Sequence, residues 1–288
     1  MYILDGKKTS EEVKERIKCK IEKLYSEMNK VPGLAVIKIG NNAASEIYVN
    51  SKVRQCNEVG IKSKKYILEE NTSEDELLEL IEELNRDEEI DGILVQLPLP
   101  KHIDEYKVID KIALNKDVDG FKPENIGKVL LGDKNALVSC TPLGILTLMK
   151  EYSIPLEGKD VVIVGRSNIV GKPMAALLIN EGATVTVCNS KTKNLAEKTL
   201  SADILIVAIG KSKFIKKEMV KENSVIIDVG INRDENRKLS GDVDFEDVKE
   251  KVSYITPVPG GVGPMTIAML LENTLKAFEK NKKLDTYR

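Results

Sequence analysis

The chain has 288 residues, of which 42% are hydrophobic and 31% are charged. This composition provides enough apolar side chains for a packed core, and the length is sufficient for two domains, so a disordered or fibrous protein is excluded. The 44 lysine and arginine residues face 46 acidic residues, which gives a formal net charge of -2 and no basic excess for a nucleic-acid backbone. We therefore expect no nucleic-acid partner.

The N-terminal segment, residues 1–18, has neither the apolar core nor the cleavage site of a secretory signal. No apolar run has the length that a bilayer-spanning helix requires, so we expect a soluble, cytoplasmic protein without a membrane partner. His102 is the only histidine, and we expect it in an exposed loop. The wide spacing of the cysteines favours free, buried thiols and no metal site. These cysteines are Cys19, Cys56, Cys140 and Cys188.

The first half of the chain alternates between helical and strand patterns. A capping box of Thr9 and Glu12 predicts a helix that continues to Met28, because apolar residues recur at helical spacing after it. A second capping box, Ser73 with Glu76, predicts another helix. The other predicted elements are a strand at 34–40, a helix at 43–60, a strand at 61–68 and a strand at 90–98. This alternation is typical of a parallel, doubly wound sheet.

The second half repeats the alternation after a passage rich in Gly and Asp at 115–135. Residues 141–152 predict a helix near the domain boundary, and residues 263–280 predict a closing helix. Strands are predicted at 159–166, 183–188, 203–208 and 224–229. We therefore expect an α/β fold with two domains. The first is 1–140 joined by the C-terminal helix 264–288, and the second is 141–263, a Rossmann-like doubly wound parallel sheet.

The segment VVIVGRSNIVGKP, residues 161–173, places Gly165 and Gly171 between a buried strand and a helix. Backbone N–H groups and the helix dipole at such a turn suit the pyrophosphate of a dinucleotide. The spacing is G-x-S-x-x-x-G and not G-x-G-x-x-G, so the pattern is equally typical of a tight turn that binds no ligand.

The end of the next predicted strand distinguishes between dinucleotides. An NAD enzyme places Asp or Glu there to bind the ribose 2′-hydroxyl, but this chain has Asn189, Ser190 and Lys191. Arg166 can pair with a 2′-phosphate, although an ordinary solvated arginine is the alternative interpretation. The pattern favours NADP over NAD.

Three polar side chains of the predicted helix at 43–60 share one face, namely Ser45, Tyr48 and Lys52. A surface contact is the more common role for a Tyr and Lys pair at this spacing. Gln96 lies at the carboxyl end of a predicted strand, where open α/β sheets bind their ligands, so its side chain requires a partner.

Two glycine-containing loops complete the set of candidates. DVDGF, residues 117–121, contains Asp117 and Asp119, for which a solvated turn carboxylate is the common explanation. PVPGGVGPMT, residues 257–266, allows close backbone approach to a ligand, although it is also typical of a turn before a helix.

Taken together and in this order, the motifs resemble the methylenetetrahydrofolate dehydrogenase/methenyltetrahydrofolate cyclohydrolase family. The matching blocks cover nearly the whole chain: SEIYVNSK (45–52), QLPLP (96–100), DVDGF (117–121), CTPLG (140–144), VVIVGRSNIVGKP (161–173), CNSKT (188–192) and TPVPGGVGPMT (256–266). The resemblance implies two α/β domains that flank a cleft, a homodimer, and NADP on the second domain. It also implies tetrahydrofolate derivatives as substrates, with the first domain as the folate-binding catalytic domain.

The resemblance further implies roles for individual residues. Lys52 matches the catalytic lysine, with Gln96 as its hydrogen-bond partner. Tyr48 matches the aromatic side chain that stacks on the folate, and Asp119 matches the carboxylate that holds the pterin. Further folate contacts are implied for Ser45, Leu97, Pro98, Pro259, Gly260, Gly261 and Gly263. Cofactor contacts are implied for Gly165, Arg166, Ser167, Ile169, Val170, Gly171, Ser190, Lys191, Thr192 and Ile231.

The expected activity is NADP-dependent oxidation of 5,10-methylene-tetrahydrofolate, followed by hydrolysis of the methenyl product to 10-formyl-tetrahydrofolate. By the resemblance, such a multifunctional enzyme, both oxidoreductase and hydrolase, serves one-carbon metabolism and purine biosynthesis. One alternative is a shikimate-type NADP dehydrogenase, which offers no role for the QLPLP and PVPGGVGP blocks. Another is a hydrolase or NADPH-sensing relative that has lost hydride transfer.

Overall fold

A computed structural model describes residues 1–233 and 238–282, without the side chains of Ala43 and Ala44. The chain divides into two compact units, each with its own parallel sheet. Unit 1 comprises Met1–Glu11, Val129–Lys134 and Ser139–Met269. Unit 2 comprises Glu12–Lys128, Asn135–Val138 and the residues from Leu270 onward. This confirms the expected two-domain α/β fold.

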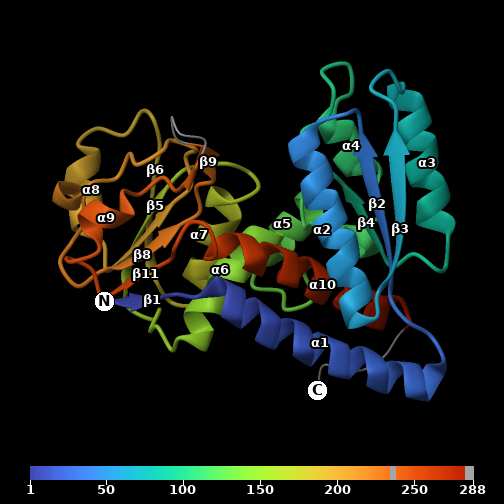
Figure 1. Cartoon of the computed structure of the whole chain (residues 1–288), viewed down its shortest axis with the longest axis horizontal. Helices are drawn as coiled ribbons and strands as arrows, with labels where there is room; N and C mark the ends of the chain where they lie inside the picture. Colours follow the sequence, from blue (N-terminus) through green and yellow to red (C-terminus); the bar gives the residue numbers. More distant parts are fainter. Residues whose placement is uncertain (234–237, 283–288) are drawn as a thin grey trace. The chain divides into compact units, whose positions relative to one another are not determined.

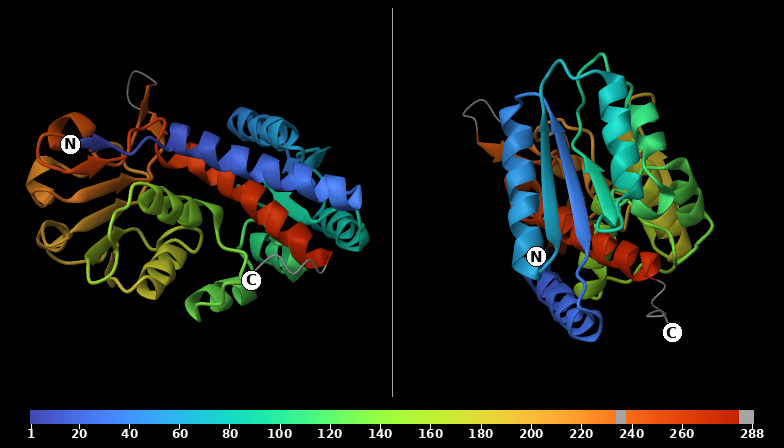
Figure 2. Two further views of the ribbon diagram at one scale, coloured as in Figure 1. Left: turned by 90° about the horizontal axis from the view of Figure 1, so that it is seen from below. Right: turned by 90° about the vertical axis from the view of Figure 1, so that its right-hand side faces the viewer.

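Unit 2 contains, among its described residues, a three-stranded sheet of order β3-β2-β4. Its strands are β2 (Gly33–Ile39), β3 (Lys62–Leu68) and β4 (Gly92–Val95), and all of them are parallel. Helix α2 (Ala43–Val59) covers one face, and α3 (Glu74–Arg86) and α4 (Glu105–Lys111) cover the other (Figures 1 and 2). Ile37 of β2 and Val95 of β4 pack in one core cluster with Leu77 of α3. Because successive side chains of a strand point to opposite faces, the residues next to them in each strand face α2.

Unit 1 contains, among its described residues, a six-stranded parallel sheet of order β1-β11-β8-β7-β5-β6 (Figure 1). Its strands are β1 (Tyr2–Ile3), β5 (Asp160–Val164), β6 (Thr184–Cys188), β7 (Ile204–Val207), β8 (Val225–Asp228) and β11 (Tyr254–Ile255). Strands β6 and β7 lie on opposite sides of β5, so the winding direction reverses there. In doubly wound folds, ligands bind outside the carboxyl ends of the strands at this reversal.

The remaining elements connect or cover these sheets. The longer helices are α1 (Gly6–Met28), α5 (Pro123–Leu130), α6 (Cys140–Glu151), α7 (Gly171–Asn180) and α10 (Val262–Asn281). The shorter elements are η1 (Leu114–Lys116), α8 (Leu195–Leu200), η2 (Lys217–Met219), α9 (Phe245–Val248) and the antiparallel pair β9 (Asn232–Arg233) and β10 (Leu239–Ser240). Residues 283–288 of the predicted C-terminal segment lie outside the described residues.

The helix boundaries correct one prediction and confirm another. Ser73 and Glu76 form the predicted capping box at the start of α3. The predicted box at Thr9 is wrong, because α1 already begins at Gly6. Asp5 Oδ1 accepts the backbone N–H of Lys8, and Thr9 Oγ1 donates to the Asp5 carbonyl inside the helix. An aspartate four residues earlier therefore provides the cap.

Two further findings concern exposure. Cys56, Cys140 and Cys188 are buried thiols as predicted, whereas Cys19 is exposed on α1. The predicted burial of all four thiols is therefore wrong at Cys19, because it lies away from the apolar stripe of its helix. Among the described residues, no helix is long and apolar enough to cross a membrane.

Candidate functional site

The predicted lysine and glutamine meet in unit 2. Lys52 Nζ on α2 donates to Gln96 Oε1 over 3.0 Å. The amide is fixed at its other end, because Gln96 Nε2 donates to the Leu97 carbonyl over 2.7 Å. The backbone N–H of Gln96 donates to the Ile37 carbonyl, which continues the sheet beyond β4. The sheet thus holds the acceptor oxygen of Gln96 toward the lysine.

The other predicted residues of α2 lie on the same helix with different exposure. Ser45 is buried, and its backbone N–H donates to Asn42 Oδ1 over 3.1 Å at the start of the helix. Tyr48 is 43% exposed, so part of its ring surface is open to contact. Lys52 is half-buried one turn further along. The helix therefore presents a phenol and an amine at neighbouring positions of one face.

Cys56 lies one turn beyond Lys52 and needs a separate test as a nucleophile. Burial raises the pKa of the Cys56 thiol to about 12, although the positive charge of Lys52 acts in the opposite direction. A thiol with this pKa is protonated near neutral pH, and the thiolate is the reactive form. Cys56 is therefore a packing residue of α2 and not a nucleophile near neutral pH.

The loop that contains both aspartates assigns them different roles. Asp117 is buried and accepts from the backbone N–H groups of Phe121 and Lys122 and from Asn125 Nδ2, at 3.1, 2.9 and 2.8 Å. Its burial raises the pKa of its carboxyl group. The expected solvated turn carboxylate is therefore wrong for Asp117, which organises the loop. Asp119 follows two residues later and is half-buried.

Helix α10 also holds this loop in place. Asn273 is buried, and its Nδ2 donates to the carbonyls of Val118 and Val138 at 2.8 Å each. Val118 directly precedes Asp119. The hydrogen bond from Asn273 therefore fixes the backbone next to this carboxylate.

The nucleotide loop of unit 1 requires its two glycines. Gly165 has a φ of +133°, and a Cβ there would lie 2.3 Å from the Ala208 carbonyl oxygen. A Cβ on Gly171 would lie 2.2 Å from the Gly165 carbonyl oxygen. Ser167 Oγ accepts from the backbone N–H groups of Val170 and Gly171 at 3.1 and 3.4 Å. The two glycines therefore allow the backbone after β5 to pack closely against the Ala208 and Gly165 carbonyls, at the carboxyl edge of the sheet.

The turn after β6 completes the cofactor candidates. Asn189 Oδ1 accepts the backbone N–H of Lys191, and Thr192 Oγ1 accepts the backbone N–H of Asn189, at 2.9 and 2.8 Å. Ser190, Lys191 and Arg166 are exposed, and no carboxylate lies between positions 189 and 192. Exposed Ile169 and Ile231 are the apolar members of the predicted set. This donor set, with two cations and no carboxylate, fits a 2′-phosphate.

The glycine-rich loop after β11 is fixed by backbone contacts. Gly261 N–H donates to the Pro257 carbonyl, and Lys7 N–H at the start of α1 donates to the Gly260 carbonyl, both over 2.9 Å. Gly260 has a φ of +106°, and the Val258–Pro259 peptide is cis. The Leu97–Pro98 peptide of the QLPLP block is also cis. Both proline-containing blocks thus have defined backbone shapes beside predicted site residues.

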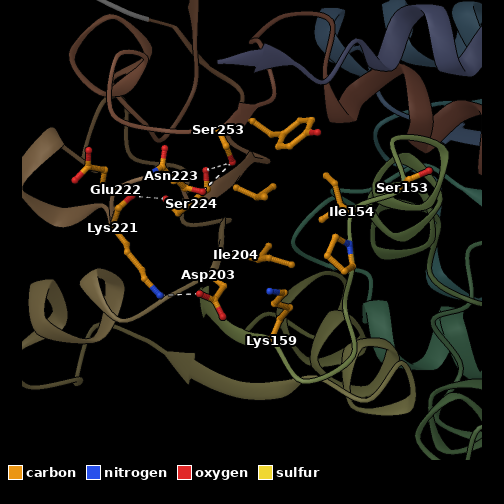
Figure 3. Close-up of a pocket in the computed structure, with 13 residues that line it drawn as sticks. Ser153, Ile154, Lys159, Asp203, Ile204, Lys221, Glu222, Asn223, Ser224 and Ser253 are labelled. Carbon is orange, nitrogen blue, oxygen red and sulfur yellow. Dashed lines mark hydrogen bonds and ion pairs between the residues drawn. The ribbon is translucent and has the colours of Figure 1, made fainter.

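A cavity of about 220 Å³ lies elsewhere in unit 1 (Figure 3). It lies at the amino ends of β7, β8 and β11 and includes an ion pair of 2.7 Å between Lys221 and Asp203. None of the predicted site residues lines it. It is therefore distinct from the loops at the carboxyl ends of the same strands.

Sequence reasoning overlooked two buried carboxylates at that carboxyl edge, Asp228 and Asp242. Asp228 ends the apolar strand β8, which is a signal that sequence can provide, whereas Asp242 follows a two-residue strand without a recognisable pattern. Burial, and to a lesser extent the charge of Asp242, raise the pKa of Asp228 to about 6, although three backbone N–H groups act in the opposite direction.

Comparison with known proteins also divides the chain into two regions. Residues 4–119 match the model of the tetrahydrofolate dehydrogenase/cyclohydrolase catalytic domain, and residues 139–282 match the NAD(P)-binding domain of the same family. The chain belongs to the tetrahydrofolate dehydrogenase/cyclohydrolase family. The resemblance inferred from the motifs is thereby confirmed, and so is the Rossmann-like character of the second domain.

Individual relatives are similar over their full length. The bifunctional protein FolD of Campylobacter hominis is 58% identical, over 98% of this chain and 99% of the relative. The crystal structure of the bifunctional FolD of Campylobacter jejuni superposes with a TM-score of 0.95 at 54% identity, covering 97% of this chain and 99% of that chain. A Trypanosoma brucei FolD structure, complexed with NADP and an inhibitor, has a TM-score of 0.94 at 33% identity and covers 98% and 99% of the two chains.

The shikimate-type alternative shares the fold alone. A shikimate dehydrogenase structure from Thermus thermophilus has 15% identity and a TM-score of 0.53, over 86% of this chain. That level of likeness carries no information about the substrate.

Proposed function

We propose that the protein is a bifunctional enzyme that oxidises 5,10-methylene-tetrahydrofolate with NADP and hydrolyses the methenyl product to 10-formyl-tetrahydrofolate. The observation that carries the proposal is the 3.0 Å hydrogen bond from Lys52 to Gln96 in a chain that belongs to this family along nearly its whole length. In this proposal, the predicted domain 1–140 with the C-terminal helix 264–288 binds folate, and the predicted domain 141–263 binds NADP.

Lys52 is the proposed proton-transfer group of the hydrolysis. Water that attacks the methenyl cation must lose a proton, and the folate nitrogen that leaves the former bridge must gain one. Gln96 Oε1 accepts one N–H of Lys52. This hydrogen bond restricts rotation of the amine, and the other substituent positions on Nζ point away from the amide of Gln96. The amine is therefore held in one orientation before the substrate binds.

Tyr48, Ser45 and Asp119 are the proposed folate-binding residues of unit 2. The 43% exposed ring of Tyr48 can stack on the pterin or the aryl group. Asp119 can accept two hydrogen bonds from the pterin, one oxygen facing the amino group and the other facing the ring N–H. An amide at this position has only one oxygen and cannot pair with both donors in this way. Leu97, Pro98, Pro259, Gly260, Gly261 and Gly263 remain predicted folate contacts on the same argument from the family.

The residues of unit 1 fit NADP. Gly165, Ser167 and Gly171 form the close turn for the pyrophosphate, and Arg166 and Ser190 provide donors for the 2′-phosphate. When bound, NADP supplies the hydride acceptor. Lys191, Thr192, Ile169, Val170 and Ile231 complete the predicted contact set of the cofactor.

The protein is also proposed to act as a homodimer. Strand β6 is an edge strand of the six-stranded sheet in the described residues, and its sequence TVTVC contains no charge and no proline. Val187 on this strand is 39% exposed. An edge strand without charges or prolines is a template for pairing with another chain, and a second copy satisfies it symmetrically. Action in the cytoplasm, with 10-formyl-tetrahydrofolate directed to purine biosynthesis, belongs to the same proposal.

The test is folate-dependent reduction of the cofactor by purified protein. NADPH formation with 5,10-methylene-tetrahydrofolate, faster than NADH formation with NAD, is the expected result. A hydrolase without hydride transfer, or an NADPH-sensing protein, forms no reduced cofactor under these conditions. Absence of NADPH from folded protein that still hydrolyses the methenyl substrate would select the hydrolase and reject the proposal.

A further inference from the structure

A single buried carboxylate in unit 1 accepts hydrogen bonds from several backbone N–H groups of one loop. Asp242 is fully buried. Its Oδ2 accepts from the backbone N–H groups of Ile209 and Gly210 at 2.7 and 3.0 Å, and its Oδ1 accepts from that of Lys211 at 2.7 Å. Oδ1 also accepts from Asn232 Nδ2 at 2.9 Å. Three successive amides and one side-chain amide therefore point at one anion, which is the strong, charge-assisted form of the hydrogen bond.

The loop that Asp242 holds lies at the point where the sheet reverses its winding. The loop follows β7, and its first residue, Ala208, donates its backbone N–H to the Val164 carbonyl over 2.8 Å. The carbonyl of Ala208 is the group that a Cβ on Gly165 would approach to 2.3 Å. Ala208, the residue before the three amides that Asp242 accepts, is therefore in direct contact with the nucleotide loop after β5.

Asp242 also reaches the segment that follows β8. Asn232 directly follows Ile231, which is 52% exposed and belongs to the predicted cofactor contacts. A Cβ on Gly230 would lie 2.4 Å from Asp242 Cγ, so the carboxylate packs against this backbone as well. One side chain thus links the loops after two neighbouring strands.

A second carboxylate fixes the backbone of Asp242 itself. Asp228 Oδ1 accepts from the N–H groups of Gly230 and Asp242 at 3.0 and 2.9 Å, and Oδ2 accepts from Val243 at 2.9 Å. A Cβ on Gly241 would lie 1.8 Å from Asp228 Oδ2, so only glycine fits between the two acids. Asp228 at the end of β8 therefore anchors Asp242 to the sheet.

These contacts indicate which half of the dinucleotide depends on Asp242. In a doubly wound sheet, the two halves of a dinucleotide lie on the two sides of the reversal point. The proposed 2′-phosphate residues, Arg166 and Ser190, follow β5 and β6, on one side. The loops held by Asp242 follow β7 and β8, on the other side. We propose that Asp242 is a positioning residue that fixes these loops for the nicotinamide half of NADP. This inference rests on the proposed function.

The experiment separates the two halves of the cofactor with two probes. Binding of NADP and of 2′,5′-ADP, which lacks the nicotinamide half, is measured by calorimetry for wild type and Asp242→Asn. In this variant an NH2 group replaces one carboxylate oxygen and faces backbone N–H donors, so those hydrogen bonds are lost. Asp203→Asn is the matched control, because Asp203 directly precedes β7 at the amino edge of the same sheet and accepts from Lys221 (Figure 3). Turnover of 5,10-methylene-tetrahydrofolate and hydrolysis of the methenyl substrate are recorded in parallel.

The expected result is selective. Asp242→Asn weakens NADP or lowers the kcat of hydride transfer by about tenfold to a hundredfold, because small misplacements at a reacting centre have effects of this size. It leaves 2′,5′-ADP binding and methenyl hydrolysis unchanged, and Asp203→Asn changes none of these. Equal losses of NADP and 2′,5′-ADP would show a merely structural role, and unchanged binding and kcat would show no role; either overturns the inference.

A second variant keeps the inference testable if Asp242→Asn does not fold. Asn232→Ala removes one donor and leaves the three backbone amides on Asp242. It is expected to lower kcat or NADP affinity in the same selective way but to a smaller extent, and an unchanged variant would overturn the inference. Failure of the proposed function is distinguishable, because wild type then binds no NADP or reduces none with folate.

Discussion

Replacement of Lys52 by methionine tests the proposed proton-transfer role at a single atom. Methionine keeps an unbranched side chain on α2 but removes the Nζ that donates to Gln96 Oε1 over 3.0 Å. A positioned proton-transfer group contributes about 10²- to 10⁴-fold to a rate. Cyclohydrolase turnover is therefore expected to fall by that factor, which corresponds to about 3–5 kcal/mol of activation free energy.

The assay follows loss of the methenyl absorbance with purified variant, and calorimetry follows NADP binding. NADP binding is expected to be unchanged, because Arg166 and Ser190 belong to unit 1 whereas Lys52 belongs to unit 2. Lys65→Met is the matched control, since Lys65 Nζ donates to Asn50 Oδ1 over 3.1 Å on the exposed surface of the same unit. Undiminished hydrolysis by Lys52→Met, or an equal loss in the control, would refute the role of Lys52.

Four further predictions concern the cofactor site, the buried acid, the nucleotide turn and the edge strand. Arg166→Ala is expected to weaken NADP by about tenfold or more and NAD much less, because hydrogen bonds to charged groups contribute about 1.5–3 kcal/mol; equal losses in titrations contradict the 2′-phosphate role. Burial raises the pKa of Asp228 from its ordinary 3.8 to about 6, so the folded protein keeps a proton that the unfolded chain has released. Stability from this group is therefore present below the lower pKa and lost as pH rises through the higher one, by up to about 3 kcal/mol. Asp228→Asn is expected to reduce the fall in unfolding free energy across this window in urea titrations, and a fall as large as that of wild type argues against the assignment. Gly165→Ala is expected to lower Tm, because Gly165 has a φ of +133°, whereas Gly127→Ala is not, because a Cβ there meets nothing within 4 Å; similar Tm values exclude the strain argument. Val187→Lys is expected to produce a monomer in sedimentation analysis, and an unchanged dimer means that β6 is not the interface.

The resemblance to the family implies the pairing of Lys52 with Gln96, and two simple rules locate the two residues separately. Helical spacing placed the lysine on the face of α2 that carries Tyr48, and the carboxyl-end rule placed Gln96 where ligands bind. The structure then supplied the 3.0 Å contact. Strands β2 to β8 were predicted from their runs of apolar and β-branched residues. Strands β1 and β11 were not, because two residues are too few to show a pattern.

Long-range backbone contacts explain what the sequence could not provide. The carboxylate of Asp242 binds amides that lie 31 to 33 residues earlier in the chain, and backbone donors leave no residue type to recognise. The sequence pattern at Asp117 indicates only a turn. It does not show the three donors of this carboxylate, because they depend on the course of the loop and on Asn125. At Thr9, the capping-box pattern indicated the wrong start of the helix, and only the structure shows that Asp5 provides the cap.

The central claim is that one chain performs both reactions, and a single time course tests it directly. Purified protein is mixed with 5,10-methylene-tetrahydrofolate and NADP, and NADPH and the methenyl absorbance are recorded together. The account predicts NADPH formation without lasting accumulation of the methenyl species, because Lys52 supports its hydrolysis. Persistent methenyl absorbance beside NADPH would contradict the hydrolytic half, and absence of NADPH from folded protein would contradict the account as a whole.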